Sequence, residues 1–209
     1  MRPLTDECPK PMLDLAGKPL IHRHIERLAA AGFGEIVINL AWLGGQIRES
    51  LGDGADFGVS IRYSDEGDAA LETGGGINKA LPLLGDEPFL LVNGDVWSDI
   101  AYHPRELGSG DLAHLVLVPN PAHNSAGDFV FADGRAQPDG SEGARYTFSG
   151  VSVLHPELIR NAGSEGAFPL APLLREAIRK GEVSAELHDG NWVDIGTPER
   201  LKEAASLLR

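Results

Sequence analysis

The sequence predicts an α/β fold with a doubly wound, mostly parallel sheet, helices on both of its faces and a small β-rich portion. Strand-like and helix-like segments alternate in the first half of the chain, which is typical of parallel strands joined by helical crossovers. In the second half, Gly- and Asp-rich turns separate strand-like segments without long helices. The 209 residues, 42% of them hydrophobic, suit one domain with a substantial core.

The elements of the first half follow from hydrophobic periodicity and end signals. Apolar residues recur on one face of a helix over residues 19–31, and Gly32 ends it. The other elements expected in this half are a strand at 35–40, a helix at 43–51, a strand at 60–64, a helix at 77–84 entered through three glycines, and a strand at 89–92.

The second half is predicted to be richer in strands. Asp133-Gly134 is typical of a hairpin turn, and Thr197-Pro198 is typical of a helix cap followed by a first helical turn. The expected elements are strands at 114–118, 129–131 and 147–154, an amphipathic helix at 170–180, a strand at 192–195 and a helix at 198–208.

Composition argues against several classes of function. A formal net charge of -13 argues against a nucleic-acid partner, because recognition of nucleic acid needs clustered Lys and Arg. Cys8 is the only cysteine, which excludes an internal disulfide and a thiolate metal cluster and fits a cytoplasmic location. No apolar run reaches membrane-spanning length and no signal-peptide pattern follows Met1, so no membrane partner is expected.

Two carboxylates stand where an α/β fold binds ligands. Asp95 follows the strand at 89–92, and open α/β sheets bind ligands beyond the carboxyl ends of their strands. Asp194 alternates with two apolar neighbours, so it should face away from the core that those neighbours enter. If the two aspartates converge, they form a site for a divalent cation. The Asn-Gly-Asp run that contains Asp95 is equally consistent with a simple turn.

Two further segments suit anions. Three glycines at 74–76 precede a predicted helix and would let a ligand approach the N–H groups of the helix start. Lys10 lies between Pro9 and Pro11, which fix its backbone and present a cation suited to a phosphate. The alternative interpretation of the glycine run is a flexible entry to the helix, and that of Lys10 is an ordinary loop residue. His22 and His24 fall on different helix faces and are interpreted as surface or partly buried residues, not as metal ligands.

Together these segments resemble the sugar-1-phosphate nucleotidyltransferase family over nearly the whole chain. The ordered set of motifs carries the resemblance: Pro3-Leu4-Thr5, Pro9-Lys10-Pro11-Met12, Ala16-Gly17-Lys18-Pro19-Leu20, Leu71-Glu72-Thr73-Gly74-Gly75-Gly76, Val92-Asn93-Gly94-Asp95, Phe148-Ser149-Gly150 and Trp192-Val193-Asp194-Ile195-Gly196-Thr197. The short length and the run from Asn93 to Trp97 are most similar to the uridylyltransferases that act on N-acetylmuramate 1-phosphate in peptidoglycan recycling.

The resemblance implies a Rossmann-like, GT-A-like nucleotidyltransferase fold and a reaction between a nucleoside triphosphate, UTP in the nearest relatives, and a sugar 1-phosphate. The sugar-phosphate oxygen attacks the α-phosphorus and pyrophosphate leaves, with Mg²⁺ as cofactor. The resemblance assigns Lys10, Asp95 and Asp194 to catalysis, and Asp95 and Asp194 to the metal. It assigns nucleotide binding to Glu72, Thr73, Gly74, Gly75, Gly76 and Asn93, and sugar binding to Gly94, Trp97, Asp128, Phe148 and Gly150.

The sequence departs from the family pattern in two places. Relatives have a strand and a glycine-rich loop before the segment that starts here at Met1. We therefore expect residues 1–209 to form a single nucleotidyltransferase domain that lacks that strand and phosphate loop, and a polypeptide starting at Met1 to be marginally folded and nearly inactive. Pro169 stands where a lysine is expected in the nearest relatives, which bears on the identity of the sugar.

Two alternatives remain open at the level of sequence. A mannose-1-phosphate guanylyltransferase, or a uridylyl- or thymidylyltransferase for glucose 1-phosphate, would share every motif above. A non-catalytic nucleotide-sugar-binding protein is the second alternative. Two carboxylates brought together without a metal would repel each other, which favours the enzyme. No feature of the sequence predicts an oligomeric state.

Overall fold

The computed structural model describes residues 1–67, 70–162 and 166–208, and the chain folds into two compact units. Unit 1 comprises Met1–Ala70, Gly94–Pro104 and Asn191–Arg209. Unit 2 comprises Leu71–Asn93 and Arg105–Gly190. Each unit is therefore assembled from segments that are far apart in the sequence.

One part of unit 1 is a parallel strand pair with helices packed on it. Strands β3 (Glu35–Leu40) and β4 (Ser60–Asp65) pair in parallel, with Glu35 opposite Ser60. Helices α1 (Leu20–Ala30) and α2 (Gly44–Leu51) share a hydrophobic cluster with these strands. The shorter elements of this part are η1 (Lys10–Met12), β1 (Asp14–Leu15), β2 (Lys18–Pro19) and η2 (Ala55–Phe57).

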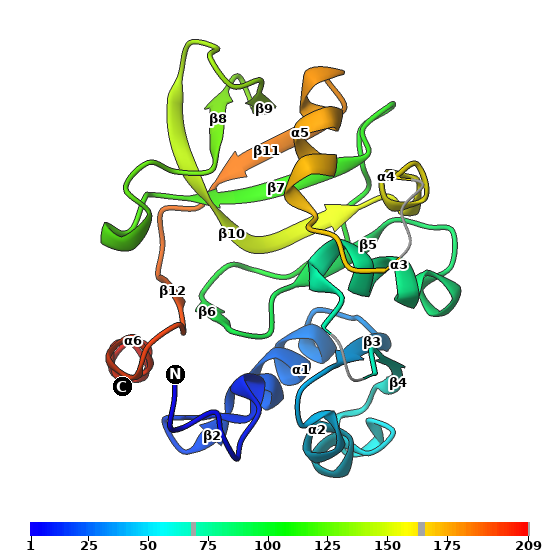
Figure 1. Cartoon of the computed structure of the whole chain (residues 1–209), viewed down its shortest axis with the longest axis vertical. Helices are drawn as coiled ribbons and strands as arrows, with labels where there is room; N and C mark the ends of the chain where they lie inside the picture. The colour runs from blue at the N-terminus through cyan, green and yellow to red at the C-terminus, as the bar shows by residue number, and fades with distance from the viewer. Residues whose placement is uncertain (68–69, 163–165, 209) are drawn as a thin grey trace. The chain divides into compact units, whose positions relative to one another are not determined.

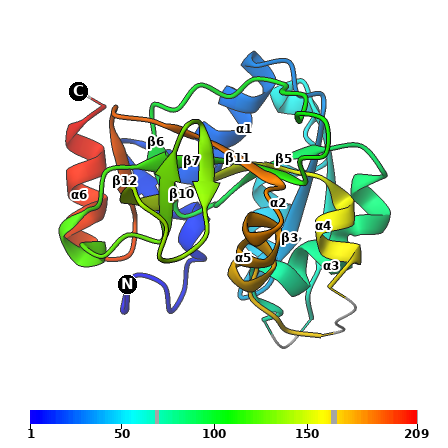
Figure 2. The ribbon, with the colours of Figure 1, turned by 90° about the horizontal axis from the view of Figure 1, so that it is seen from above.

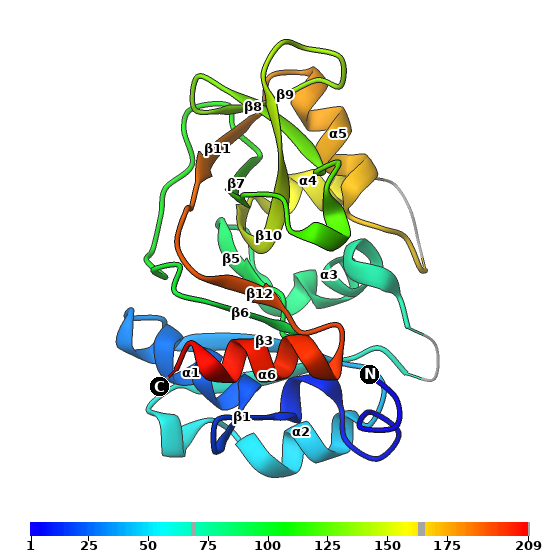
Figure 3. The same ribbon diagram turned by 90° about the vertical axis from the view of Figure 1, so that its left-hand side faces the viewer.

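The other part of unit 1 joins three distant segments in one core. Strands β6 (Val96–Ser98) and β12 (Trp192–Asp194) pair antiparallel, and helix α6 (Pro198–Ser206) lies beside β12 and β1 (Figure 3). Thr197 caps α6, as the sequence predicts, by accepting a hydrogen bond from the Arg200 N–H at 3.3 Å. The buried residues of this core are Leu15, Leu20, Trp97, Val193, Ile195 and Ala204.

Unit 2 is built on a six-stranded sheet in the order β5-β10-β7-β11-β9-β8. Its strands are β5 (Phe89–Val92), β7 (Ala113–Val118), β8 (Phe129–Ala132), β9 (Arg135–Gln137), β10 (Ala144–Leu154) and β11 (Val183–Leu187). The turn between β8 and β9 is the predicted hairpin, with both Asp133 and Gly134 at positive φ. Figure 2 shows the sheet from above, with α5 (Ala171–Arg179) on one face.

The prediction of a mostly parallel sheet is wrong for this unit. Among the described strands of unit 2, only β7 and β11 pair in parallel, and the other pairings are antiparallel. The reason is β10, an 11-residue strand that lies between β5 and β7 and runs antiparallel to both. Strand β10, from the second half of the chain, therefore pairs with β5, from the first half.

Three helices close the core of unit 2. They are α3 (Glu72–Leu84), α4 (Pro156–Arg160) and α5, and all three contribute buried residues to one cluster with the sheet (Figure 1). Leu115 and Leu117 of β7 are fully buried in this cluster. A short turn, η3 (Ala122–Asn124), precedes β8. In the described part of the chain, no helix is both long and apolar enough to cross a membrane.

Candidate active site

Lys10 and Asp95 form an ion pair in unit 1. The Lys10 Nζ atom lies 2.7 Å from Asp95 Oδ2, and both side chains are about one third exposed. Lys10 stands on η1, where Pro9 is extended before it and Pro11 follows it. Pro11 in turn lies against Gly94, where an added Cβ atom would come within 3.3 Å of the proline ring. The predicted phosphate-binding lysine is thus packed directly beside the segment that carries Asp95.

Asp194 lies on the strand next to the Asp95 segment. In the β6–β12 pair, Asp194 is opposite Val96, and the Ile195 N–H donates to the Asp95 carbonyl at 2.7 Å. Val193 and Ile195 are buried while Asp194 is about one third exposed, which confirms the predicted alternation. The structure therefore places Lys10, Asp95 and Asp194 on adjoining segments of unit 1, although Lys10 and Asp194 are nearly two hundred residues apart in sequence.

Arg200 is a residue of this site that the sequence interpretation missed. Its guanidinium Nη1 donates to the Asp194 carboxylate from the first turn of α6. A signal was present in the sequence, because the first turn of a helix favours acidic residues and disfavours a cation. A cation at that position indicates a specific carboxylate partner nearby.

Asp95 and Asp194 supply carboxylate oxygens, the type of ligand that Mg²⁺ takes, from adjoining segments of unit 1. Mg²⁺ is commonly bound by one or two carboxylates together with substrate phosphate oxygens. In residues 1–67, 70–162 and 166–208 there is no cluster of three or more His, Cys, Asp or Glu side chains that could hold a metal alone. A site of this composition would therefore need its substrate to complete the metal's coordination.

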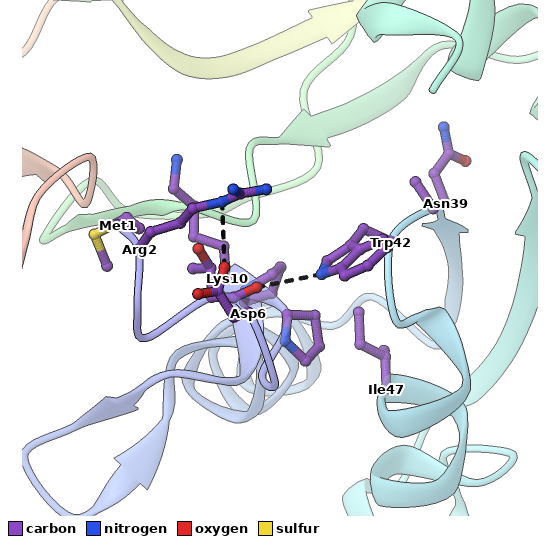
Figure 4. Close-up of a pocket in the computed structure, with 11 residues that line it drawn as sticks. Met1, Arg2, Asp6, Lys10, Asn39, Trp42 and Ile47 are labelled. Carbon is purple, nitrogen blue, oxygen red and sulfur yellow. Dashed lines mark hydrogen bonds and ion pairs between the residues drawn. The ribbon is translucent and has the colours of Figure 1, made fainter. Parts of the chain in front are cut away.

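A pocket of about 470 Å³ opens beside Lys10 in unit 1 (Figure 4). It lies at the carboxyl end of β3, where Asn39 and Trp42 contribute to its wall. Trp42 is 68% exposed, and its indole N–H donates to the Thr5 carbonyl at 3.2 Å. Trp42 is therefore an exposed aromatic side chain of the pocket wall.

Helix α1 braces the segment that follows Asp95. The Arg27 guanidinium donates to the carbonyls of Ser98, at 2.7 Å, and of Ile100. It also lies 4.3 Å from the centre of the Tyr102 ring. His24 Nδ1 is 3.1 Å from the Tyr102 hydroxyl oxygen, and the imidazole is buried, which corrects the interpretation of His24 as a surface or partly buried residue.

The glycine run of unit 2 lies inside a helix and packs against the chain itself. Helix α3 begins at Glu72, five residues before the predicted start, so Gly74, Gly75 and Gly76 are helical and buried. The Gly75 N–H donates to the Phe168 carbonyl at 3.0 Å. Added Cβ atoms would overlap Phe168 at Gly74 and the Gly166 carbonyl at Gly75. The close approach of residues 166–168 therefore accounts for Gly74 and Gly75. The Glu72 and Thr73 side chains at the start of α3 are exposed.

Replacing Gly75 with alanine is expected to lower the free energy of unfolding by about 2 kcal/mol, because the new methyl group meets a backbone carbonyl that cannot turn away. For a chain of this size, the melting temperature should fall by about 4–8 °C. Gly45→Ala is the matched control, since Gly45 is also an early helical glycine but has open space around it. That variant should be slightly more stable than the wild type. Equal melting temperatures for Gly75→Ala and the wild type would contradict the packing argument.

The predicted sugar-side residues of unit 2 gather around a bulge in β10. The register between β10 and β7 shifts between Phe148 and Ser152. Gly150, at φ +80°, lies in this shift, and an added Cβ atom would come within 2.8 Å of the Asn93 side chain. The Asn93 N–H donates to the Gly150 carbonyl at 2.8 Å. The bulge therefore fixes Asn93, which directly precedes Gly94 and Asp95 in the chain.

Asp128 and Trp97 have structural contacts of their own. The Asp128 carboxylate accepts hydrogen bonds from the Phe148 N–H at 2.8 Å and from the Asn124 side chain at 3.1 Å, so it fastens the start of the bulge. The prediction of Trp97 on the sugar side needs correction, because its indole is a buried member of the unit 1 core beside Val193. Packing against apolar neighbours leaves little of that ring for a ligand.

Comparison with known proteins gives consistent matches. A family profile described as "Nucleotidyl transferase" matches residues 1–106. An N-acetylmuramate alpha-1-phosphate uridylyltransferase from Neisseria meningitidis is 51% identical over 99% of this chain and 92% of its own length. The enzyme of the same description from Caulobacter vibrioides is 32% identical over 100% of this chain and 91% of its own length.

A solved structure supports the fold. A Bacillus anthracis protein assigned as a glucose-1-phosphate thymidylyltransferase has a TM-score of 0.86 to this chain, covering 100% of this chain and 90% of that one at 18% identity. At that identity the match concerns the fold alone. It establishes the α/β nucleotidyltransferase fold expected from the sequence, with the mixed sheet described above in place of a mostly parallel one.

Proposed function

The chain belongs to the nucleotidyl transferase family, and we propose that it transfers UMP from UTP to N-acetylmuramate 1-phosphate, giving a UDP-sugar and pyrophosphate. The observation that carries this proposal is the 51% identity to the Neisseria enzyme, which runs through 99% of the chain. Both units lie within that match, so we propose that residues 1–209 serve one nucleotidyltransferase domain. The product places the enzyme in the recycling of peptidoglycan.

In this reaction, an oxygen of the sugar phosphate forms a bond to the α-phosphorus of UTP. The bond from that phosphorus to the bridging oxygen breaks, and pyrophosphate leaves with the electron pair. Lys10 would bind the phosphates and offset their negative charge, since its position is fixed by η1. Asp95 and Asp194 would hold Mg²⁺, which supplies charge neutralisation and Lewis acidity when bound. The remaining contribution of the protein is to align the two substrates.

We assign the nucleotide base to Glu72, Thr73 and the glycines that follow them, with Asn93 beside it. The exposed side chains at the start of α3 support this assignment. We assign sugar contacts to Gly94 in unit 1 and, separately, to Phe148 and Gly150 in unit 2, where Asp128 positions the backbone of β10. Pro169, which stands in place of an expected lysine, immediately follows Phe168 at the glycine contact, so this position offers no cation to a sugar phosphate.

The proposal predicts a preference for UTP over GTP of roughly tenfold or more, because a pocket shaped for a pyrimidine excludes the larger purine. Pyrophosphate release should be measured with UTP, GTP and dTTP, each paired with the 1-phosphates of N-acetylmuramate, glucose and mannose. An Asp95→Asn preparation, purified in parallel, controls for contaminating activities. Faster release with GTP and mannose 1-phosphate would replace this function with that of a guanylyltransferase.

A further inference from the structure

Each carboxylate of the aspartate pair has its own protein cation. Asp95 is paired with Lys10 at 2.7 Å, and Asp194 is paired with Arg200. The Arg200 and Asp194 side chains are 22% and 32% exposed, so both retain contact with solvent. A divalent cation that binds the Asp194 carboxylate must therefore replace or repel the guanidinium already bound to it.

The backbone before Arg200 is shaped to allow this ion pair. Gly196 lies directly under the guanidinium, and an added Cβ atom at this position would overlap it. Thr197 fixes the first turn of α6 through its hydrogen bond to the Arg200 N–H. Arg200 thereby holds a cation at a helix start, where the helix dipole alone would disfavour one. The ion pair with Asp194 offsets this unfavourable interaction between the guanidinium and the helix dipole.

We propose that Arg200 is the resident counter-ion of the metal site, and that Mg²⁺ loads onto Asp194 by exchange for the Arg200 guanidinium. This inference rests on the proposed function, which assigns Asp95 and Asp194 to the metal. No covalent bond changes, because one carboxylate oxygen releases a hydrogen-bonded cation and coordinates another. The exchange frees the guanidinium beside the site, and a planar guanidinium is a suitable donor to phosphate oxygens.

The expected effect is an increase in metal affinity when Arg200 is removed. Ion pairs with this exposure are weak, so the gain should be about two- to fivefold. Mn²⁺ is the probe, because its free and bound forms are counted directly by electron paramagnetic resonance in the absence of substrate. The proteins to compare are the wild type, Arg200→Met, Gly196→Ala and Lys202→Met. Lys202 is exposed on the same helix, so its variant controls for the loss of one positive charge.

Gly196→Ala is the sharper variant, because its methyl group displaces the flexible end of Arg200 without any change in net charge. Both Arg200→Met and Gly196→Ala should bind Mn²⁺ more tightly, while Lys202→Met should stay close to the wild type. Unchanged or weaker binding in either test variant would overturn the inference, as would an equal gain in Lys202→Met. Thermal melting of each variant verifies that it is folded.

An Asp194→Asn protein separates this inference from the function on which it rests. If Asp194→Asn loses Mn²⁺ binding but the two test variants gain none, the metal assignment stands and the counter-ion role of Arg200 is wrong. If the wild type binds no Mn²⁺, or if Asp194→Asn binds as much Mn²⁺ as the wild type, both the metal assignment and the inference fail. The pyrophosphate assay then still decides the transfer reaction on its own.

Discussion

Replacing Asp95 or Asp194 with asparagine is expected to lower turnover about a thousandfold while leaving the protein folded. A bound metal stabilises the charge of a phosphoryl transition state by several kcal/mol, and each 1.36 kcal/mol is a factor of ten in rate. Asparagine keeps the size of the side chain but removes the charge that holds the cation. Stability should change by only about 1 kcal/mol, since both carboxylates belong to partly exposed ion pairs.

The measurement is turnover of UTP at saturating Mg²⁺, with thermal melting of the same samples. Asp56→Asn is the matched control, because Asp56 is an exposed carboxylate of the same unit that lies outside the site. It should retain wild-type turnover. Wild-type activity in either site variant would remove that aspartate from the metal site, and a large fall in melting temperature would indicate a structural role instead.

Acidification from pH 6.5 to pH 4 is expected to lower the free energy of unfolding by about 3 kcal/mol through His24 alone. Burial of the imidazole, helped by the charge of Arg27, lowers the pKa of His24 from 6.5 to about 4 in the folded protein. The folded state thus favours the neutral ring. This contribution to stability is complete above pH 6.5 and is lost as the pH falls toward 4, because the unfolded chain takes up the proton first.

The test compares denaturant unfolding at pH 7 and pH 5 for the wild type and for His24→Leu. Removing the imidazole should flatten the dependence of stability on pH, even if the variant is less stable at both values because it loses the hydrogen bond with Tyr102. His103→Leu controls for the loss of an exposed imidazole beside the same tyrosine. An unchanged dependence in His24→Leu would show that other groups cause the acid sensitivity.

Sequence patterns were sufficient to predict most of the helices and strands and to identify the family. Strand 35–40, strand 89–92 and the cap at Thr197 are where periodicity and end signals put them, since those signals act locally. The ordered motifs identified the family, which the full-length match confirms. The same motifs put Lys10, Asp95 and Asp194 into one group, and the structure pairs Lys10 with Asp95 and places Asp194 on the adjoining strand, while their catalytic roles remain a prediction.

The features that the sequence did not predict depend on contacts between distant segments. The antiparallel sheet order required knowing that β10 pairs with β5, a choice that no local pattern encodes. The close packing of Gly74 and Gly75 against residues 166–168 was not predicted, because the approach of Phe168 has no signature of its own. The burial of His24 likewise depends on Tyr102, which lies 78 residues further along the chain.

The discontinuous core of unit 1 sets the order in which the catalytic group is completed during synthesis on the ribosome. Leu15 and Leu20 leave the ribosome early, but their partners Val193 and Ile195 come only after residues 71–190 have been made. At the usual rate of about 5–20 residues per second, the 173 positions from Leu20 to Val193 correspond to a delay of roughly 9–35 s. During that interval the nascent chain carries Lys10 and then Asp95 without Asp194, so it can acquire neither the proposed metal site nor the α6 cover of its apolar core. Unit 2, in contrast, can close before the last segment is translated.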